Sequence, residues 1–288
     1  MLRTLLLILI SLLINSCLKR FIKSDKEIEK HYSNKLIKPQ YHTLHTLGFK
    51  VNYATVCTDS TLPLLVMIHG APGAWYGWMA QLDDTILQKN FRMLAFDRPG
   101  YNKSREGRTV NDIDSQTMII NKLIEMHRMG TKVIVMGRSY GSPIAIMAAA
   151  LHPEWVDGLM LISSATDSVS EKYYWFSRLG KTKLVRWLLP APLNTATNEK
   201  FAHPLQLGKA KKYYSKVKCP AVIIYGDKDY VAYNINSTKL DSEMLNSPHK
   251  LICVKGADHF IALKRPEIVR EELMEMLSKI GIVPNYKH

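Results

Sequence analysis

The chain has 288 residues, of which 47% are hydrophobic and 22% are charged. This length is enough for one large α/β domain, or two small ones, with an apolar core. The composition excludes a wholly disordered, collagen-like or multi-span membrane protein. Lysine and arginine number 39 against 25 acidic residues, a formal charge of +14, which favours an anionic partner such as a phospholipid surface or a nucleic acid.

The first seventeen residues form a short targeting signal. A basic start is followed by an apolar run over residues 5–14, which ends before the roughly 20 residues that a spanning helix needs. The segment from Leu13 to Cys17 resembles the lipobox of bacterial lipoproteins, in which the cysteine is acylated and becomes the mature N-terminus. The resemblance implies a signal peptide over residues 1–16, a lipid anchor on Cys17 and a location in the bacterial cell envelope. An uncleaved membrane anchor is the alternative interpretation.

Residues 17–40 are polar and of mixed charge, which predicts a lipidated tether. Such a segment gains about 1 kcal/mol for each Lys or Arg near an anionic bilayer, unless it is a merely solvated linker. Cys57, Cys219 and Cys253 have no metal-like spacing. We expect three buried thiols, with a Cys219–Cys253 disulfide as the alternative.

From residue 41 the chain predicts an α/β domain. An opening hairpin is expected over residues 41–47 and 49–56, because Gly48 marks a turn. Short, mostly continuous apolar runs then predict strands in a sheet that is covered on both faces, at residues 64–68, 91–96, 132–136, 156–162, 221–225 and 250–254. Helical patterns lie at 112–129, 142–151 and 266–280. This alternation predicts a mostly parallel central sheet flanked by helices, with residues 41–165 and 219–288 as its core.

Residues 166–218 interrupt this rhythm. They separate two strands by far more than an ordinary crossover, and they hold eight aromatic residues and eleven basic residues against three acidic ones. An insertion of this length is usually functional. We therefore expect a cap or lid over a binding site.

The strongest local motif is Gly137-Arg138-Ser139-Tyr140-Gly141, which follows a predicted strand and precedes a predicted helix. Glycines on both flanks let a strand turn sharply into a helix, so that the central serine stands exposed with the helix N-terminus beside it. Ser139 is the candidate nucleophile.

A serine nucleophile needs a base and a carboxylate that orients the base. Two further motifs end predicted strands: Gly226-Asp227-Lys228-Asp229, and Asp258-His259 after Gly256. The carboxyl ends of parallel strands are where open α/β sheets place their sites. His259 is therefore the candidate base, and Asp229 or Asp227 the candidate acid.

From about residue 43 to residue 280 the chain resembles the α/β-hydrolase superfamily, in the motifs above together with His69-Gly70-Ala71-Pro72-Gly73 and the segment from Asp97 to Ser104. The resemblance implies an α/β-hydrolase fold with a helical cap insertion, and a Ser139–Asp229–His259 triad. It also implies an oxyanion hole made by the backbone N–H groups of Ala71 and Tyr140. Chemistry of this kind requires no cofactor and no metal.

Departures from related subclasses narrow the expected reaction. Epoxide hydrolases and haloalkane dehalogenases share the His-Gly-x-Pro loop but use an aspartate nucleophile, so Ser139 favours a carboxylic ester, small or lipid-like. Asn102 replaces a usual glycine and is expected to adopt a positive φ. A peptidase or amidase with the same triad, or a non-catalytic surface-binding lipoprotein, are the alternatives. The membrane, reached through the lipid anchor and the basic cap, is the expected partner; no nucleic-acid recognition motif is present.

Overall fold

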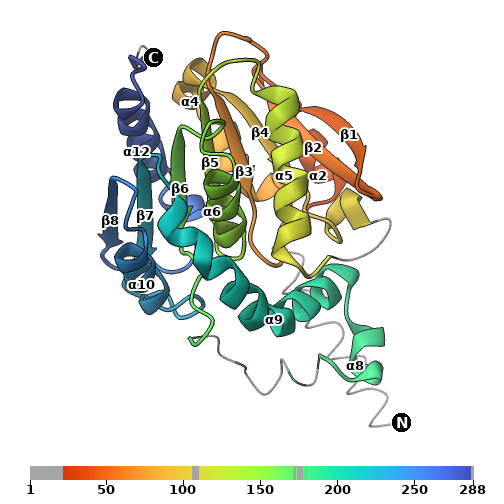
Figure 1. The fold of residues 1–288 in the computed structure, drawn as a ribbon. Helices are drawn as coiled ribbons and strands as arrows, with labels where there is room; N and C mark the ends of the chain where they lie inside the picture. Colours follow the sequence, from red (N-terminus) through yellow and green to blue (C-terminus); the bar gives the residue numbers. More distant parts are fainter. Residues whose placement is uncertain (1–21, 106–109, 171–172, 174–177, 179, 287–288) are drawn as a thin grey trace.

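The computed structural model describes residues 22–105, 110–170, 173, 178 and 180–286. Its centre is an eight-stranded sheet in the order β1-β2-β4-β3-β5-β6-β7-β8 (Figure 1). The strands are β1 (Gln40–Thr46), β2 (Phe49–Val56), β3 (Leu64–Ile68), β4 (Arg92–Phe96), β5 (Val133–Arg138), β6 (Gly158–Ile162), β7 (Ala221–Gly226) and β8 (His249–Val254). β1 and β2 form an antiparallel hairpin, β2 also pairs antiparallel with β4, and the other pairs are parallel. The predicted α/β fold is confirmed.

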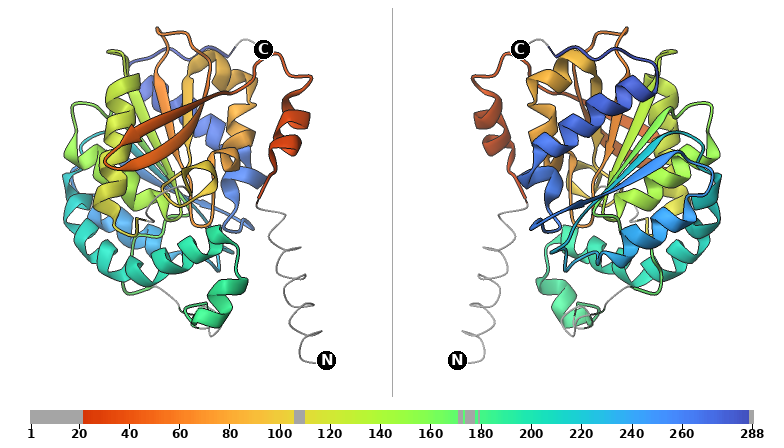
Figure 2. Two further views of the ribbon diagram at one scale, coloured as in Figure 1. Left: turned by 90° about the vertical axis from the view of Figure 1, so that its right-hand side faces the viewer. Right: turned by 90° about the vertical axis from the view of Figure 1, so that its left-hand side faces the viewer.

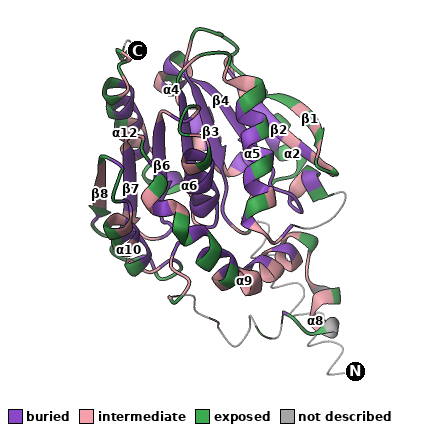
Figure 3. Cartoon of the chain, viewed as in Figure 1, coloured by how far each residue is buried: buried purple, intermediate pink, exposed green. Residues whose placement is uncertain are grey.

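Helices cover both faces of this sheet (Figures 1 and 2). The α-helices are α2 (Asp25–Tyr32), α3 (Met79–Leu82), α4 (Thr85–Asn90), α5 (Ile113–His127), α6 (Gly141–Leu151), α8 (Lys183–Leu188), α9 (Ala191–Ala210), α10 (Ile235–Glu243), α11 (Ile261–Lys264) and α12 (Pro266–Lys279), and the 3₁₀ helices are η1 (Trp75–Trp78), η2 (Asn102–Arg105) and η3 (Lys211–Lys216). One apolar cluster joins α5, α6 and α10 to one face of the sheet, and a second joins α2, α3, α4 and α12 to the other. The central strands are buried on both sides (Figure 3), which explains their continuous apolar sequences.

The edge strand β8 differs from the prediction. Four of its residues are half-buried and Cys253 is exposed, because β8 has a neighbouring strand on one side only. Cys57, Cys219 and Cys253 are free thiols in the described chain. Cys57 and Cys219 are half-buried and Cys253 is exposed, so the expectation of three buried thiols was wrong, and no Cys219–Cys253 disulfide is present among these residues. Burial raises the pKa of the Cys219 thiol to about 12.

Part of the expected tether is a folded element. α2 begins with a capping box, in which the Ser24 side chain accepts a hydrogen bond from the Glu27 backbone N–H while the Glu27 carboxylate accepts from the Ser24 backbone N–H. Ile28 and Tyr32 are buried against the core. Residues 25–32 thus belong to the folded domain, whereas the predicted signal peptide and Cys17 lie outside the described residues. Within the described part of the chain, no helix has both the length and the apolar character needed to cross a bilayer.

The segment expected to form a cap contains α8, α9 and η3. α9 lies across the end of the sheet (Figure 1). Its buried side chains are mostly polar and recur at helical spacing: Thr195, Glu199, His203, Gln206, Leu207 and Ala210. α9 therefore docks on the core mainly through polar side chains.

Candidate active site

Ser139 occupies a sharp turn between β5 and α6. Its φ is +53°, a left-handed conformation that is uncommon for a residue with a side chain and that is found at nucleophile elbows. The flanking glycines are required by crowding: a Cβ on Gly137 would lie 2.6 Å from the Gly141 carbonyl oxygen, and a Cβ on Gly141 would lie 2.4 Å from the Ile68 carbonyl oxygen. The local sequence thus fixes Ser139 at the carboxyl end of the central strand.

Asp229 and His259 come together from the loops that follow β7 and β8. The Nδ1 atom of His259 lies 2.8 Å from the Asp229 Oδ2 atom, and both residues are buried. The other carboxylate oxygen of Asp229 accepts hydrogen bonds from the backbone N–H groups of Val231 (2.9 Å) and Ala232 (2.8 Å). Among the described residues, neither the His259 Nε2 atom nor the Ser139 Oγ atom makes a hydrogen bond. The structure thus joins His259 to Asp229 but shows no hydrogen bond between Ser139 and His259.

The other two carboxylates of these motifs have different partners. Asp227 Oδ1 accepts from the Gly256 backbone N–H at 2.6 Å. Asp258 accepts from the Phe260 backbone N–H at 3.0 Å and pairs with Lys264. Asp227 thus joins the loop after β7 to the loop after β8, and Asp258 stabilises its own turn. Asp229 is the carboxylate that contacts the His259 ring.

The loop after β3 packs directly on Ser139. A Cβ on Gly70 would lie 3.0 Å from the Ser139 Cβ atom and 3.5 Å from its Oγ atom, so a side chain at this position would crowd Ser139. Among the described residues, the backbone N–H groups of Ala71 and Tyr140 donate to no protein acceptor. These are the two groups that the sequence predicts as oxyanion donors, and their lack of a partner leaves them available to a ligand.

His69 and Asp97 are buried and make hydrogen bonds beside the loop after β3. The fully buried His69 accepts the Arg98 backbone N–H at Nε2 (3.0 Å), which places its proton on Nδ1, 2.7 Å from the Gly70 carbonyl oxygen. Burial lowers the pKa of His69 well below its usual range. Asp97 accepts hydrogen bonds from the Trp75 backbone N–H and the Asn102 side chain, both at 2.9 Å. Asn102 has the expected positive φ, at +42°.

Arg98 and Glu199 form a fully buried ion pair that the sequence analysis did not predict. The Arg98 Nη1 atom lies 2.5 Å from Glu199 Oε1, and Nη2 lies 3.1 Å from Oε2. The Tyr101 hydroxyl donates to the same carboxylate at 2.5 Å. Because Glu199 is committed to Arg98, this acid of the cap is not available to hold a substrate amine.

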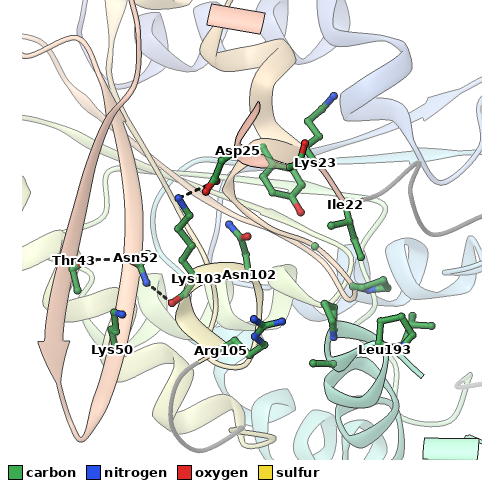
Figure 4. Close-up of a pocket in the computed structure, with 17 residues that line it drawn as sticks. Ile22, Lys23, Asp25, Thr43, Lys50, Asn52, Asn102, Lys103, Arg105 and Leu193 are labelled. Carbon is green, nitrogen blue, oxygen red and sulfur yellow. Dashed lines mark hydrogen bonds and ion pairs between the residues drawn. The ribbon is translucent and has the colours of Figure 1, made fainter. Parts of the chain in front are cut away.

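A groove of about 690 Å³ is bounded in part by the loop after β3 (Figure 4). Pro72 and Gly73 line it, whereas Ser139 and His259 do not. Its other walls come from residues 22–25, the β1–β2 hairpin, residues 102–105 and residues 190–193. Four of the lining residues are basic, namely Lys23, Lys50, Lys103 and Arg105, and Lys103 pairs with Asp25 at 3.0 Å.

Comparisons with known proteins agree with this architecture. Residues 63–203 match the α/β hydrolase fold family. A 104-residue segment is 31% identical to the AB hydrolase superfamily protein YfhM of Bacillus subtilis and covers 35% of each chain. Epoxide hydrolase 1 of Caenorhabditis elegans is 25% identical over 285 residues, which cover 80% of this chain and 68% of the relative. The match to YfhM spans only about a third of the length of that protein.

Among solved structures, that of a membrane phospholipase A described as a bacterial virulence factor superposes with a TM-score of 0.64 at 20% sequence identity. The superposition covers 97% of this chain and 99% of that one. At this identity the likeness concerns the fold alone. The family match over residues 63–203, the strand order and this likeness together show that the chain has the α/β-hydrolase fold.

Proposed function

We propose that the protein is a serine hydrolase that cleaves carboxylic esters at a bacterial membrane, with Ser139 as nucleophile, His259 as base and Asp229 as the orienting acid. The observation that carries the proposal is the 2.8 Å contact between His259 Nδ1 and a buried Asp229 carboxylate oxygen, at the sheet edge where Ser139 occupies its turn. This contact keeps the proton on Nδ1 and leaves Nε2 as the basic nitrogen.

In the first half of the reaction, His259 Nε2 takes the proton from Ser139 Oγ as that oxygen attacks the ester carbonyl carbon. The imidazolium that forms is stabilised by Asp229, whose second oxygen is held by two backbone N–H groups. The negative charge that develops on the carbonyl oxygen is stabilised by the N–H groups of Ala71 and Tyr140. Each such donor is worth roughly 2.7 to 4 kcal/mol in measured cases.

In the second half, His259 gives its proton to the departing alcohol, and an acyl-Ser139 ester remains. The same Nε2 atom then takes a proton from water as the water oxygen attacks this ester. Collapse of the second oxyanion releases the carboxylic acid and restores the Ser139 hydroxyl.

Two features at one end of the molecule support a membrane-facing cap. Ile22, the first described residue, lines the same groove as Leu193 near the start of α9 (Figure 4), so a lipid anchor five residues earlier, on Cys17, would be tethered near this groove. On α8, which directly precedes α9, the Trp187 side chain is 83% exposed. Exposed tryptophan is typical of segments that lie at a bilayer interface. Basic residues of the neighbouring groove would favour an anionic group on a lipid-like substrate.

Turnover of matched chromogenic substrates tests the proposal. We expect the full chain in detergent to hydrolyse p-nitrophenyl esters with a kcat/KM at least about a hundredfold higher than that for the corresponding anilides, and Ser139→Ala to lose at least about a thousandfold in kcat. Lys279→Ala, an exposed change on α12, is the control and should keep wild-type activity. Faster cleavage of the anilide would favour the peptidase alternative, and full ester turnover by Ser139→Ala would refute the role of Ser139.

A further inference from the structure

The buried ion pair between Arg98 and Glu199 joins the cap helix α9 to the loop that carries the candidate oxyanion donor. Both side chains have no exposed surface. Burying an ion pair gives little net stability unless every donor and acceptor is satisfied. Stability alone therefore does not explain this ion pair, and the other hydrogen-bond partners of Arg98 point to a further role.

Arg98 uses its other N–H groups on the loop itself. Its Nε atom donates to the His69 carbonyl oxygen and its Nη2 atom to the Gly70 carbonyl oxygen, both at 3.0 Å. Nη1 also donates to Gln116 Oε1 at 2.7 Å. All five N–H groups of the guanidinium are thus engaged, and its planar fork permits only one orientation relative to the loop.

Holding the Gly70 carbonyl fixes the direction of the Ala71 N–H. These two groups belong to one trans peptide unit, in which the C=O and N–H bonds point in opposite directions. With the carbonyl bound to Arg98 and His69, the Ala71 N–H is turned away from both. The N–H of this unit therefore has its orientation set by the Arg98 guanidinium, whose own position depends on Glu199.

Tyr140, whose backbone N–H is the second candidate donor, contacts the same face of α9 through its ring. The Tyr140 ring lies between the Arg98 guanidinium, 4.6 Å from the ring centre, and the His203 ring, 4.5 Å away and nearly parallel. Glu199 and His203 are four residues apart and so project from one side of α9. α9 thus contacts the Tyr140 side chain and, through Arg98, the loop that carries Ala71.

We propose that Glu199 is a positioning residue: through its ion pair with Arg98, the packing of α9 on the core sets the geometry of the oxyanion hole. This inference rests on the proposed function, because it concerns the same hydrolytic site. When Arg98 is not held by Glu199, the Gly70 carbonyl keeps its contact with His69 but loses a fixed guanidinium donor, so the Ala71 N–H is held less exactly toward the developing charge. The ground-state ester does not need that hydrogen bond, so turnover is affected more than binding.

The test compares Glu199→Gln with wild type in the full chain, with kcat expressed per mole of folded protein. We expect kcat for a p-nitrophenyl ester to fall at least about tenfold while KM stays within about threefold, because the amide keeps the size of the side chain but not the charge that fixes Arg98. Glu243→Gln is the matched control: it removes the charge from the partly exposed Lys211–Glu243 ion pair (2.7 Å), which joins η3 to α10, and should keep wild-type kcat.

Arg98→Lys is the second variant. It keeps a positive charge for Glu199, but a single ammonium cannot reproduce the planar bidentate geometry that bonds both the loop carbonyls and the carboxylate, so we expect a similar fall in kcat. A folded form of either variant with wild-type kcat, or a change confined to KM, would overturn the inference. Ser139→Ala is measured in parallel: turnover that survives in Ser139→Ala contradicts the proposed function, whereas turnover lost there but kept in Glu199→Gln contradicts the positioning role alone.

Discussion

Asp97 is a carboxylate with no exposed surface, held in the turn after β4. It accepts hydrogen bonds from Trp75 and Asn102, but burial outweighs these bonds and raises the pKa of its carboxyl to about 7. An acid whose pKa is higher in the folded than in the unfolded state binds its proton more tightly when folded. Its contribution to the free energy of unfolding is therefore complete below about pH 4 and is lost as the pH rises to about 7.

Asp97→Asn should remove this pH dependence. We expect the stability of wild type relative to the variant to fall, as the pH is raised from about 4 to about 7, by on the order of 4 kcal/mol. Thermal unfolding of both proteins across this pH range measures the difference. A difference that stays constant from pH 4 to pH 8 would contradict the assignment.

At the scale of single residues, local motifs could be predicted from the sequence, whereas distant pairs could not. Ser139 and His259 follow apolar strands within short signatures, so their positions at the sheet edge could be inferred from local spacing. Arg98 and Glu199 are 101 residues apart, and no spacing rule links them. The one available signal was a glutamate in a strongly basic insertion.

At the scale of elements, the continuous apolar runs predicted the central strands because both faces of those strands are covered. The same pattern could not reveal that β8 is at the edge of the sheet, since edge position depends on strand order rather than on the strand's own residues. The spacing of Ser24 and Glu27 is that of a capping box and could have predicted the start of α2. The surrounding charged residues instead favoured a tether. α9 buries polar side chains, and its docking face therefore has no apolar periodicity.

At the scale of the whole molecule, α8 and α9 lie at one end and the C-terminal segment lies at the other (Figures 1 and 2). The groove is lined by residues from the start of the described chain and from the start of α9. If a membrane contacts the cap, the exposed Trp187 lies at the contact. The net charge of +14 adds an attraction to anionic lipid that salt screens.

Sedimentation with vesicles tests this orientation. We expect a chain spanning residues 18–288 to bind anionic vesicles more than neutral ones, to lose most of that binding at high salt, and to lose several-fold in binding on Trp187→Ala, because an interfacial aromatic contact is removed. Tyr286→Ala changes an exposed aromatic residue at the opposite end and serves as the control. Equal binding to neutral and anionic vesicles would contradict a membrane-facing basic surface.

The role of Ser139 as an activated nucleophile is tested most directly by the intact mass of the protein after incubation with a fluorophosphonate probe. A serine that is deprotonated by His259 attacks the phosphorus atom and displaces fluoride, which leaves one covalent adduct. We predict a single adduct on the wild-type chain and none on Ser139→Ala. An unmodified, folded wild-type protein, or an equal adduct on the variant, would contradict the assignment.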